Sequence, residues 1–193
     1  MSLIAICGFQ GSGKDTLANI LIEKGYTKIS FAGLLKDVVA IIFSWDRNLL
    51  EGVTEKSRKW REKVDEWWSN RLNIPNLTPR YILQNIGTDV FRNHFHPDIW
   101  VAAIERKISN LQGVVITDCR FPNEIAMIKR LNGSLIHIYR GELPSWFGKE
   151  EEFPKNIHDS EILWTKSNFD KIIDNNGDIK ELKLKIINYL TGI

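Results

Sequence analysis

Near its amino terminus the chain carries glycines beside a lysine, a combination that can bind phosphate. The segment reads Gly8-Phe9-Gln10-Gly11-Ser12-Gly13-Lys14-Asp15-Thr16. Glycines let backbone N–H groups wrap around phosphate oxygens, and the lysine can bridge the outer phosphates of a nucleotide. A short apolar run precedes the segment and a helical pattern follows it, which is the context of a P-loop. A plain tight turn is the competing interpretation and leaves the lysine unexplained. The predicted phosphate contacts are Gly8, Gly11, Ser12, Gly13 and Lys14.

The residue after this lysine departs from the usual motif. A P-loop commonly has Ser or Thr there, whose hydroxyl binds magnesium, whereas this chain has Asp15 followed by Thr16. The same displacement by one residue is seen in nucleoside monophosphate kinases, whose P-loops read Gly-Lys-Gly-Thr. We therefore expect Asp15 and Thr16 to contact the nucleotide and to bind Mg²⁺, partly through water. The alternative is that Asp15 only stabilises the helix amino terminus through the helix dipole.

A second group of polar residues follows another strand-like run, Val114 to Thr117. Asp118, Arg120 and Glu124 come soon after it. The carboxyl ends of parallel strands are where α/β sheets bind their ligands. An aspartate there can orient magnesium or a substrate hydroxyl, and an arginine can clamp phosphate with two hydrogen bonds. The pattern predicts catalytic roles for Asp118 and Arg120, with a solvated ion pair between them as the alternative.

The elements that must position these residues alternate between strands and helices. Helical patterns, such as Asn123 to Leu131 and Ile179 to Leu190, separate most of the apolar strand-like runs. Parallel neighbours need crossover connections, so the pattern predicts an α/β fold in three layers with a parallel sheet of about five strands. The predicted strands are Leu3 to Cys7, Tyr26 to Phe31, Val114 to Asp118, Leu135 to Tyr139 and Asp170 to Ile173.

The chain is long enough for one domain, and one connection within it is unusually long. Its 193 residues are 43% apolar, which suffices for one sizeable core. About eighty residues separate the second and third predicted strands, far more than one crossover needs. We therefore expect a single domain, 1–193, with a helical insertion at about 34–112 and a lid region at about 121–160.

Composition argues against several classes of protein. The net charge is +2, which gives no strong field toward nucleic acid or membrane. Cys7 and Cys119 lie singly in apolar runs, without the spacing of a zinc site or a disulfide framework. The sequence shows neither a signal-peptide pattern nor an apolar run of membrane-spanning length. We therefore expect a cytoplasmic protein that binds neither nucleic acid nor membrane.

Several motifs, in matching order, resemble those of phage-type deoxynucleoside monophosphate kinases, which have a P-loop kinase fold. The most specific is Arg80-Tyr81-Ile82-Leu83-Gln84-Asn85-Ile86-Gly87-Thr88-Asp89. It is followed by Asp98-Ile99-Trp100 and then by Asp118-Cys119-Arg120 with Glu124. The similarity covers nearly the whole chain. Its other parts are the segments 33–37, 50–52, 158–161 and 175–177, together with Arg58 and Arg140.

This resemblance implies that ATP and Mg²⁺ are used to phosphorylate a deoxynucleoside monophosphate. It also implies a viral or phage relationship, hence the host cytoplasm, and a possible homodimer. Trp100 can stack on a base and Gln84 can hydrogen-bond a base edge, while Lys36, Arg58 and Arg120 can neutralise the acceptor phosphate. Arg140 is expected to contact ATP. The implied acceptor positions are Lys36, Arg58, Gln84, Gly87, Thr88, Trp100, Asp118, Arg120 and Glu124.

Two alternatives remain at this point. One is another small-molecule P-loop kinase, acting for example on phosphomevalonate or dephospho-coenzyme A, which would not need base-reading residues. The other is a nucleotide-binding protein without transferase activity. Lys129, Arg130 and His158 are further candidates for contacting ATP from the lid, although cations in a last helical turn also suit the helix dipole.

Overall fold

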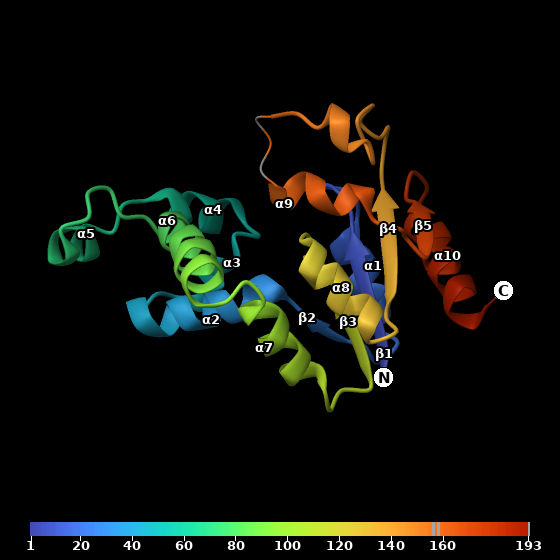
Figure 1. The fold of residues 1–193 in the computed structure, drawn as a ribbon. Helices are drawn as coiled ribbons and strands as arrows, with labels where there is room; N and C mark the ends of the chain where they lie inside the picture. Colours follow the sequence, from blue (N-terminus) through green and yellow to red (C-terminus); the bar gives the residue numbers. More distant parts are fainter. Residues whose placement is uncertain (156, 158, 193) are drawn as a thin grey trace. The chain divides into compact units, whose positions relative to one another are not determined.

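The computed structural model describes residues 1–155, 157 and 159–192 of the chain. The chain forms two compact units, one of Met1–Ser30 with Ile104–Ile193 and the other of Phe31–Ala103. The first unit contains a sheet with helices, and the second is helical (Figure 1). No helix among the described residues is both long enough and apolar enough to cross a bilayer.

Within the described residues, five parallel strands form one sheet in the order β2-β3-β1-β4-β5. Their Val- and Ile-rich runs suit strands that are buried on both faces. Each strand overlaps one of those expected from the sequence, so the prediction of a parallel α/β sheet is confirmed. The strands are β1 (Ser2–Cys7), β2 (Thr27–Ile29), β3 (Gly113–Ile116), β4 (Ser134–Tyr139) and β5 (Lys171–Asp174).

Helices cover both faces of the sheet. Because side chains alternate along a strand, Leu3 and Ile4 point to opposite faces. Ile4 belongs to the core shared with α1 (Lys14–Ile22) and α10 (Ile179–Thr191). On the other face, the side chains of Leu3 and of Ile128 in α8 (Pro122–Arg130) both pack against Gly133, in the turn that follows the helix. The unit therefore has the three layers that were predicted.

Short elements connect β4 to β5, at the place where the sequence predicted the end of a lid. They are the 3-10 turns η2 (Glu150–Glu152) and η3 (Leu163–Lys166) and the helix α9 (Asp159–Ile162). The first part of the predicted lid region contains α8, which overlaps the helix expected at Asn123 to Leu131 and whose Met127 and Ile128 are fully buried. The term lid segment is therefore used below for residues 141–155, which follow β4.

The second unit consists of short helices with clear start signals. Side chains of Asp46, Thr54, Asp65 and Thr78 accept first-turn N–H groups of successive helices. Its core joins Val39, Phe43, Leu50, Leu77 and Ile82 to half-buried tryptophans. The elements are α2 (Phe31–Phe43), α3 (Arg47–Glu51), α4 (Glu55–Glu62), α5 (Glu66–Leu72), α6 (Pro79–Gln84), the π-helix η1 (Asn85–Phe95) and α7 (Ile99–Ile108), which continues into the first unit.

Candidate active site

The P-loop follows β1, the central strand of the sheet, and leads into α1. Gly11 and Gly13 have φ angles of 81° and 102°, which L side chains rarely adopt. Gly13 is the N-cap of α1 and offers no side-chain cap to the first-turn N–H groups. These groups and the helix dipole together form a ready-made anion site.

The P-loop has no room for a side chain at Gly8, and it contains a hydroxyl group without a partner among the described residues. A Cβ at Gly8 would collide with the carbonyl oxygen of Ile138 and with the hydroxyl of Ser12. The Ser12 Oγ is buried and has no hydrogen-bond partner among the described residues. Buried hydroxyls are normally paired, so this one is suited to a ligand oxygen. A phosphate oxygen in the loop would supply the partner that the Ser12 hydroxyl lacks.

Lys14 lies inside this loop. Its Nζ donates to the carbonyl oxygens of Gly8 at 2.7 Å and Phe9 at 2.8 Å. Burial lowers the pKa of Lys14, and the nearby Arg120 cation lowers it further, while Asp15 and Glu161 raise it. Two cations close to one another at a helix amino terminus attract a polyanion.

Asn175 fixes the loop from the end of the neighbouring strand β5. Its side-chain Nδ2 donates to the carbonyl oxygen of Ser12 at 2.9 Å, and its backbone N–H donates to Tyr139 at 2.9 Å. Asn175 is buried and stands where a Cβ at Gly13 would be. The sequence motif contained Asn175, but its spacing gave no sign of this role. Arg140 donates from Nε to the carbonyl oxygen of Asn175 at 2.9 Å, and its predicted contact with ATP stays a prediction.

We predict that Asn175→Ala raises the KM for ATP about tenfold, because a buried hydrogen bond worth about 1.5 kcal/mol holds the loop in shape. Asn175→Asp should be worse near neutral pH, since its carboxylate would face a carbonyl oxygen. It should recover ATP affinity as the pH falls and the carboxyl group becomes a donor. Steady-state kinetics from pH 5 to 8 test this, with Asn110→Ala as an exposed control; pH-independent affinity in Asn175→Asp would disprove the donor role.

The loop after β3 lies beside the P-loop because β3 pairs with β1. The Cys7 thiol donates to the carbonyl oxygen of Cys119 at 3.4 Å, which joins the two strand ends. The chain leaves β1 toward β2 and leaves β3 toward β4, on opposite sides. Such a switch point at carboxyl ends of strands is where ligands bind in α/β sheets. The predicted position of Asp118 and Arg120 is thus next to the P-loop.

Hydrogen bonds order this second loop. The Ser30 hydroxyl donates to Asp118 Oδ2 at 2.7 Å. Glu124 is 2% exposed, and its Oε2 accepts the N–H groups of Arg120 at 2.7 Å and Phe121 at 3.0 Å. Glu124 therefore holds the turn that carries Arg120, whereas its predicted contact with the acceptor stays a prediction.

The guanidinium of Arg120 forms an ion pair with Glu161 of α9. Both side chains are partly exposed, at 40% and 43%, so the pair lies at the surface of the site. The Arg120 and Glu161 charges both affect the pKa of Lys14, in opposite directions, so the three charged groups lie close together. The sequence motif included Glu161 without a role, and the contact depends on residues 41 positions apart.

The predicted magnesium residues lie on the exposed side of α1. Asp15 is 78% exposed and pairs with Lys28 at 2.7 Å, and Thr16 is exposed. No three His, Cys, Asp or Glu side chains gather into a metal site in the described part of the chain. Mg²⁺ at nucleotide sites commonly takes one or two protein oxygens besides phosphates and water. The carboxylates of Asp15 and Asp118 and the hydroxyl of Thr16 fit that pattern of oxygen ligands.

The remaining predicted acceptor residues lie in the second unit. Lys36 is bound to Glu51 at 2.7 Å, and Gln84 and Thr88 are exposed. Gly87 is buried, and a Cβ there would meet Leu35. The structure thus divides the predicted residues between units: the P-loop, Asp118, Arg120, Glu124 and Arg140 lie in the first, while Lys36, Arg58, Gln84, Gly87, Thr88 and Trp100 lie in the second.

Trp100 is a packed residue in this structure. It is 6% exposed, its Nε1 donates to the carbonyl oxygen of Gly87 at 2.9 Å, and its ring lies 5.2 Å from that of Phe91. The indole thereby joins α7 to the π-helix η1. Its stacking on a base stays a prediction.

The three lid candidates have different outcomes. Lys129 pairs with Asp170 at 2.6 Å and Arg130 with Glu105 at 2.6 Å. Both lie at the end of α8 that leads into the start of β4, opposite the edge of the sheet that carries the P-loop. The structure therefore gives them no place over the phosphate site. His158 lies outside the described residues.

Sequence reasoning missed an aromatic cluster that includes a P-loop residue. The ring of Phe9 meets Trp164 at 5.0 Å, Trp146 at 5.8 Å and Phe147 at 6.2 Å, each edge to face. Phe147 in turn stacks on His137 of β4 at 4.8 Å. Trp146 and Phe147 belong to the lid segment, so this segment and the P-loop share one apolar cluster.

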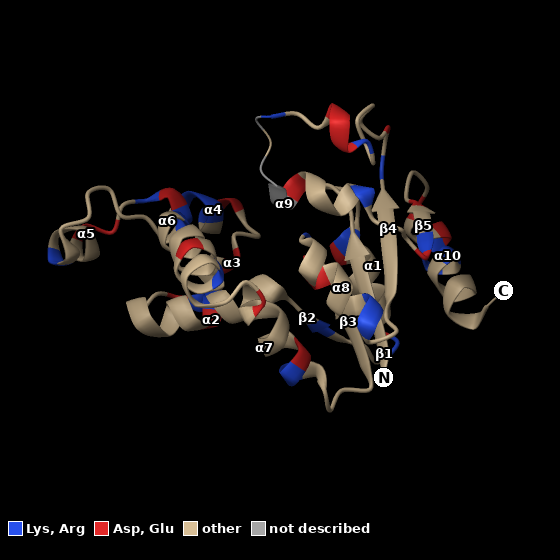
Figure 2. Ribbon diagram, viewed as in Figure 1, with Lys and Arg blue, Asp and Glu red and all other residues tan. Residues whose placement is uncertain are grey.

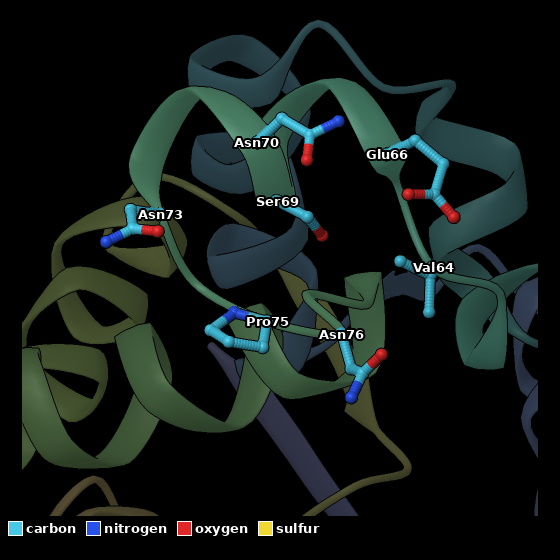
Figure 3. A pocket seen from close by; sticks show the side chains of 7 residues that line it. All are labelled: Val64, Glu66, Ser69, Asn70, Asn73, Pro75 and Asn76. Atoms are coloured by element: carbon cyan, nitrogen blue, oxygen red, sulfur yellow. The ribbon is translucent and has the colours of Figure 1, made fainter.

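The second unit has a hollow whose lining includes none of the predicted site residues (Figure 3). It is lined by Val64, Glu66, Ser69, Asn70, Asn73, Pro75 and Asn76. Its one charged group is a carboxylate, which repels phosphate. We therefore do not place a nucleotide there.

Comparisons with known proteins show the family to which the chain belongs. The family model of deoxynucleotide monophosphate kinases matches residues 55–186. A protein of Acanthamoeba polyphaga mimivirus, named as a deoxynucleotide monophosphate kinase, is 31% identical over 97% of this chain and 95% of its own length. The chain belongs to the deoxynucleotide monophosphate kinase family. The family model begins after the P-loop, so the phosphate-binding geometry is a separate observation.

Two further relatives place this deoxynucleotide monophosphate kinase family member among known proteins. A deoxynucleoside-5'-monophosphate kinase of Escherichia phage T5 is 30% identical over 58% of this chain and 46% of its own length. Both sequence relatives are viral, as the resemblance to phage-type enzymes predicted. The solved dephospho-CoA kinase of Campylobacter jejuni covers 99% of this chain and 96% of its own, with a TM-score of 0.52 and 19% identity. That likeness shows the fold alone.

Proposed function

We propose that the chain transfers the γ-phosphoryl group of ATP to the phosphate of a deoxynucleoside monophosphate, giving ADP and a deoxynucleoside diphosphate. Membership of a kinase family carries this proposal. The P-loop at the carboxyl end of β1 supports the donor half, because its helix terminus and Lys14 suit a triphosphate. The two viral relatives are named as kinases of deoxynucleotide monophosphates, which supports a deoxynucleoside monophosphate as the acceptor.

The chain's own residues act mainly by positioning and by neutralising charge. The transition state of phosphoryl transfer is loose and leaves little covalent work for the protein. Lys14 and Arg120 neutralise the charge on the transferring group, and the N–H groups at the start of α1 hold the donor phosphates. The acceptor phosphate is already ionised near neutral pH, so no general base is needed. Asp15 and Asp118 then orient ligands.

Water has to be excluded, because it could accept the phosphoryl group instead. The lid segment supports this part of the proposal, since its Trp146 and Phe147 rings contact Phe9 of the P-loop. The aromatic cluster makes the outer wall of the loop apolar. Movement of the segment would thus accompany changes in the loop.

Mg²⁺, when bound, would neutralise the phosphate oxygens of ATP. We place Asp15, Thr16 and Asp118 as its protein oxygens, partly through water. A homodimer, which the resemblance to the family implies, and a cytoplasmic location, which the composition predicts, complete the proposal.

We predict that Asp15→Asn raises the magnesium concentration needed for half-maximal turnover severalfold, because the variant keeps the shape but loses the charge. If Asp15 only pairs with Lys28 or favours the helix terminus, stability should fall by no more than about 1 kcal/mol and the magnesium dependence should not change. Turnover measured against Mg²⁺ concentration decides between them, with Lys28→Gln as the control for the lost ion pair.

ADP release with ATP and Mg²⁺ tests the proposed function directly. The four common deoxynucleoside monophosphates and their ribonucleotide counterparts form the acceptor panel. We expect ADP formation that depends on a deoxynucleotide. Equal ADP release with and without any acceptor would contradict the proposal.

A further inference from the structure

Ser30 reaches the candidate site from β2, the edge strand of the sheet beside β3. The two strands are parallel and Ile29 pairs with Ile116, so the residues that follow each strand lie at the same edge of the sheet. Across this edge the Ser30 hydroxyl donates to Asp118 Oδ2 at 2.7 Å, between residues 88 positions apart. The sequence motifs did not include Ser30, yet its hydroxyl is bonded to a predicted catalytic carboxylate.

Other groups hold the backbone of the loop that carries Asp118. The Cys7 thiol donates to the carbonyl oxygen of Cys119, and the buried Glu124 carboxylate accepts the N–H groups of the next two residues. None of these three hydrogen bonds involves the side chain of Asp118. The hydrogen bond from Ser30 does, so it fixes the direction of the carboxylate rather than the path of the loop.

The other carboxylate that we place at Mg²⁺ is less well fixed. Asp15, in the first turn of α1, is 78% exposed, and its partner Lys28 lies on β2, where Figure 2 marks basic charge. Solvent screens an ion pair of this kind, so it contributes little. The bond between Ser30 and Asp118 is partly buried, and a hydrogen bond to a charged group is stronger than one between neutral groups. Of the two carboxylates, Asp118 therefore has the more defined orientation.

We propose that Ser30 is a positioning residue for phosphoryl transfer, whose hydroxyl keeps the Asp118 carboxylate in the orientation from which it acts on Mg²⁺ and ATP. This inference rests on the proposed function, in which Asp118 supplies an oxygen to Mg²⁺, partly through water. An aspartate side chain rotates about two bonds, and a donor to one of its oxygens selects among the rotamers. A carboxylate can accept about four hydrogen bonds, so the bond from Ser30 is compatible with others to metal-bound water.

Ser30 also directly precedes α2, a position where serine often caps a helix. Capping alone would make this residue matter for stability and not for Mg²⁺. Glycine is tolerated at such a position almost as well as serine, but it has no hydroxyl to donate. Ser30→Gly therefore removes the hydrogen bond to Asp118 at little cost to the helix, while Ser30→Thr keeps a hydroxyl.

The effect of Mg²⁺ on ATP binding tests this role without phosphoryl transfer. ATP is titrated calorimetrically into each protein, once with excess Mg²⁺ and once with EDTA, and no acceptor is present. We expect Ser30→Gly to reduce the gain in ATP affinity due to Mg²⁺ about fivefold, because a hydrogen bond to a charged group is lost. Ser30→Thr should keep the gain. Ser109→Ala, which removes an exposed hydroxyl that donates to a carbonyl oxygen at 2.9 Å, is the matched control.

A double-mutant cycle shows whether Ser30 acts through Asp118. In the Asp118→Ala background there is no carboxylate to position, so Ser30→Gly should change the gain by less than about twofold. Thermal unfolding checks that each variant is folded. An undiminished effect in that background, or a Ser30→Gly protein with the same gain as the unmodified chain, would overturn the inference. So would an unmodified chain whose ATP binding does not respond to Mg²⁺.

These outcomes are distinct from those that test the proposed function, because the titrations require no ADP formation. If no deoxynucleotide supports ADP release but Ser30→Gly reduces the gain as expected, the proposed function fails and Ser30 still positions Asp118. If ADP release depends on a deoxynucleotide while Ser30→Gly leaves the gain unchanged, the inference fails and the proposed function does not.

Discussion

Lys14→Met is expected to lower turnover by about a hundredfold or more, because it removes a preorganised cation from the phosphate site. Methionine keeps most of the length of the side chain and its packing within the loop. The hydrogen bonds from Nζ to Gly8 and Phe9 are lost, but so is the cost of burying a charge near Arg120. We therefore expect the folded loop to survive while transfer fails.

ADP formation under saturating ATP and acceptor measures this effect, and thermal unfolding checks the fold. Lys24→Met, at an exposed lysine just after α1, is the matched control and should keep normal turnover. A folded Lys14→Met protein with turnover near that of the unmodified chain would refute the assignment of the P-loop.

The second large effect concerns stability and pH. We expect the free energy of unfolding to fall by about 3 kcal/mol as the pH drops from about 6.5 to about 4, through His137 alone. His137 is fully buried, and both ring nitrogens lack hydrogen-bond partners among the described residues. Burial lowers the pKa of His137 to about 4. The rings of Phe147, Trp164 and Phe169 surround it and offer no counter-charge.

The sign follows from proton binding. In the unfolded chain His137 takes up a proton near its ordinary pKa of 6.5, whereas in the folded chain it stays neutral until about pH 4. Between these values the unfolded state binds more protons, so acid favours unfolding. The stabilising effect of a neutral His137 is complete above pH 6.5 and is lost toward pH 4.

Denaturant unfolding at several pH values, on the unmodified chain and on His137→Phe, measures this contribution. Phenylalanine fits an aromatic surrounding and cannot be protonated, so the variant should lose stability less steeply below pH 6.5. Comparing the two proteins cancels the carboxylates that also titrate in acid. Identical slopes for both would show that His137 is accessible to protons in the folded state.

Much of the fold was predictable because its signals are local. Short segments of sequence predict the strands and the P-loop, as in the apolar run Leu3 to Cys7 followed by the glycines. The crossover pattern then placed Asp118 and Arg120 beside the loop, since the carboxyl ends of parallel strands share an edge. The position of these two residues was thus predictable from the spacing, while their roles stay predictions.

Contacts between distant residues were not predictable. Asn175 bonds to Ser12 across 163 positions, and Phe9 meets Trp164 only because β4 and its following loop return beside β1. The local hydrophobic periodicity of the sequence indicates neither of these contacts. The packing of Trp100 was not predictable either: the motif gave it only a ligand role, which stays a prediction, and nothing in the motif indicated that its indole is buried and hydrogen-bonded to Gly87.

The ion pair between Arg120 and Glu161 bears on selectivity among anions. The Glu161 carboxylate is an internal counter-ion of this arginine. Any incoming anion has to compete with a group tethered to the same chain, whose effective concentration is high. Free sulfate or inorganic phosphate offers only its charge in that competition. If Arg120 binds phosphate as proposed, a nucleotide would add contacts elsewhere in the site, so competition from Glu161 would weaken the binding of simple salts more than that of the nucleotide.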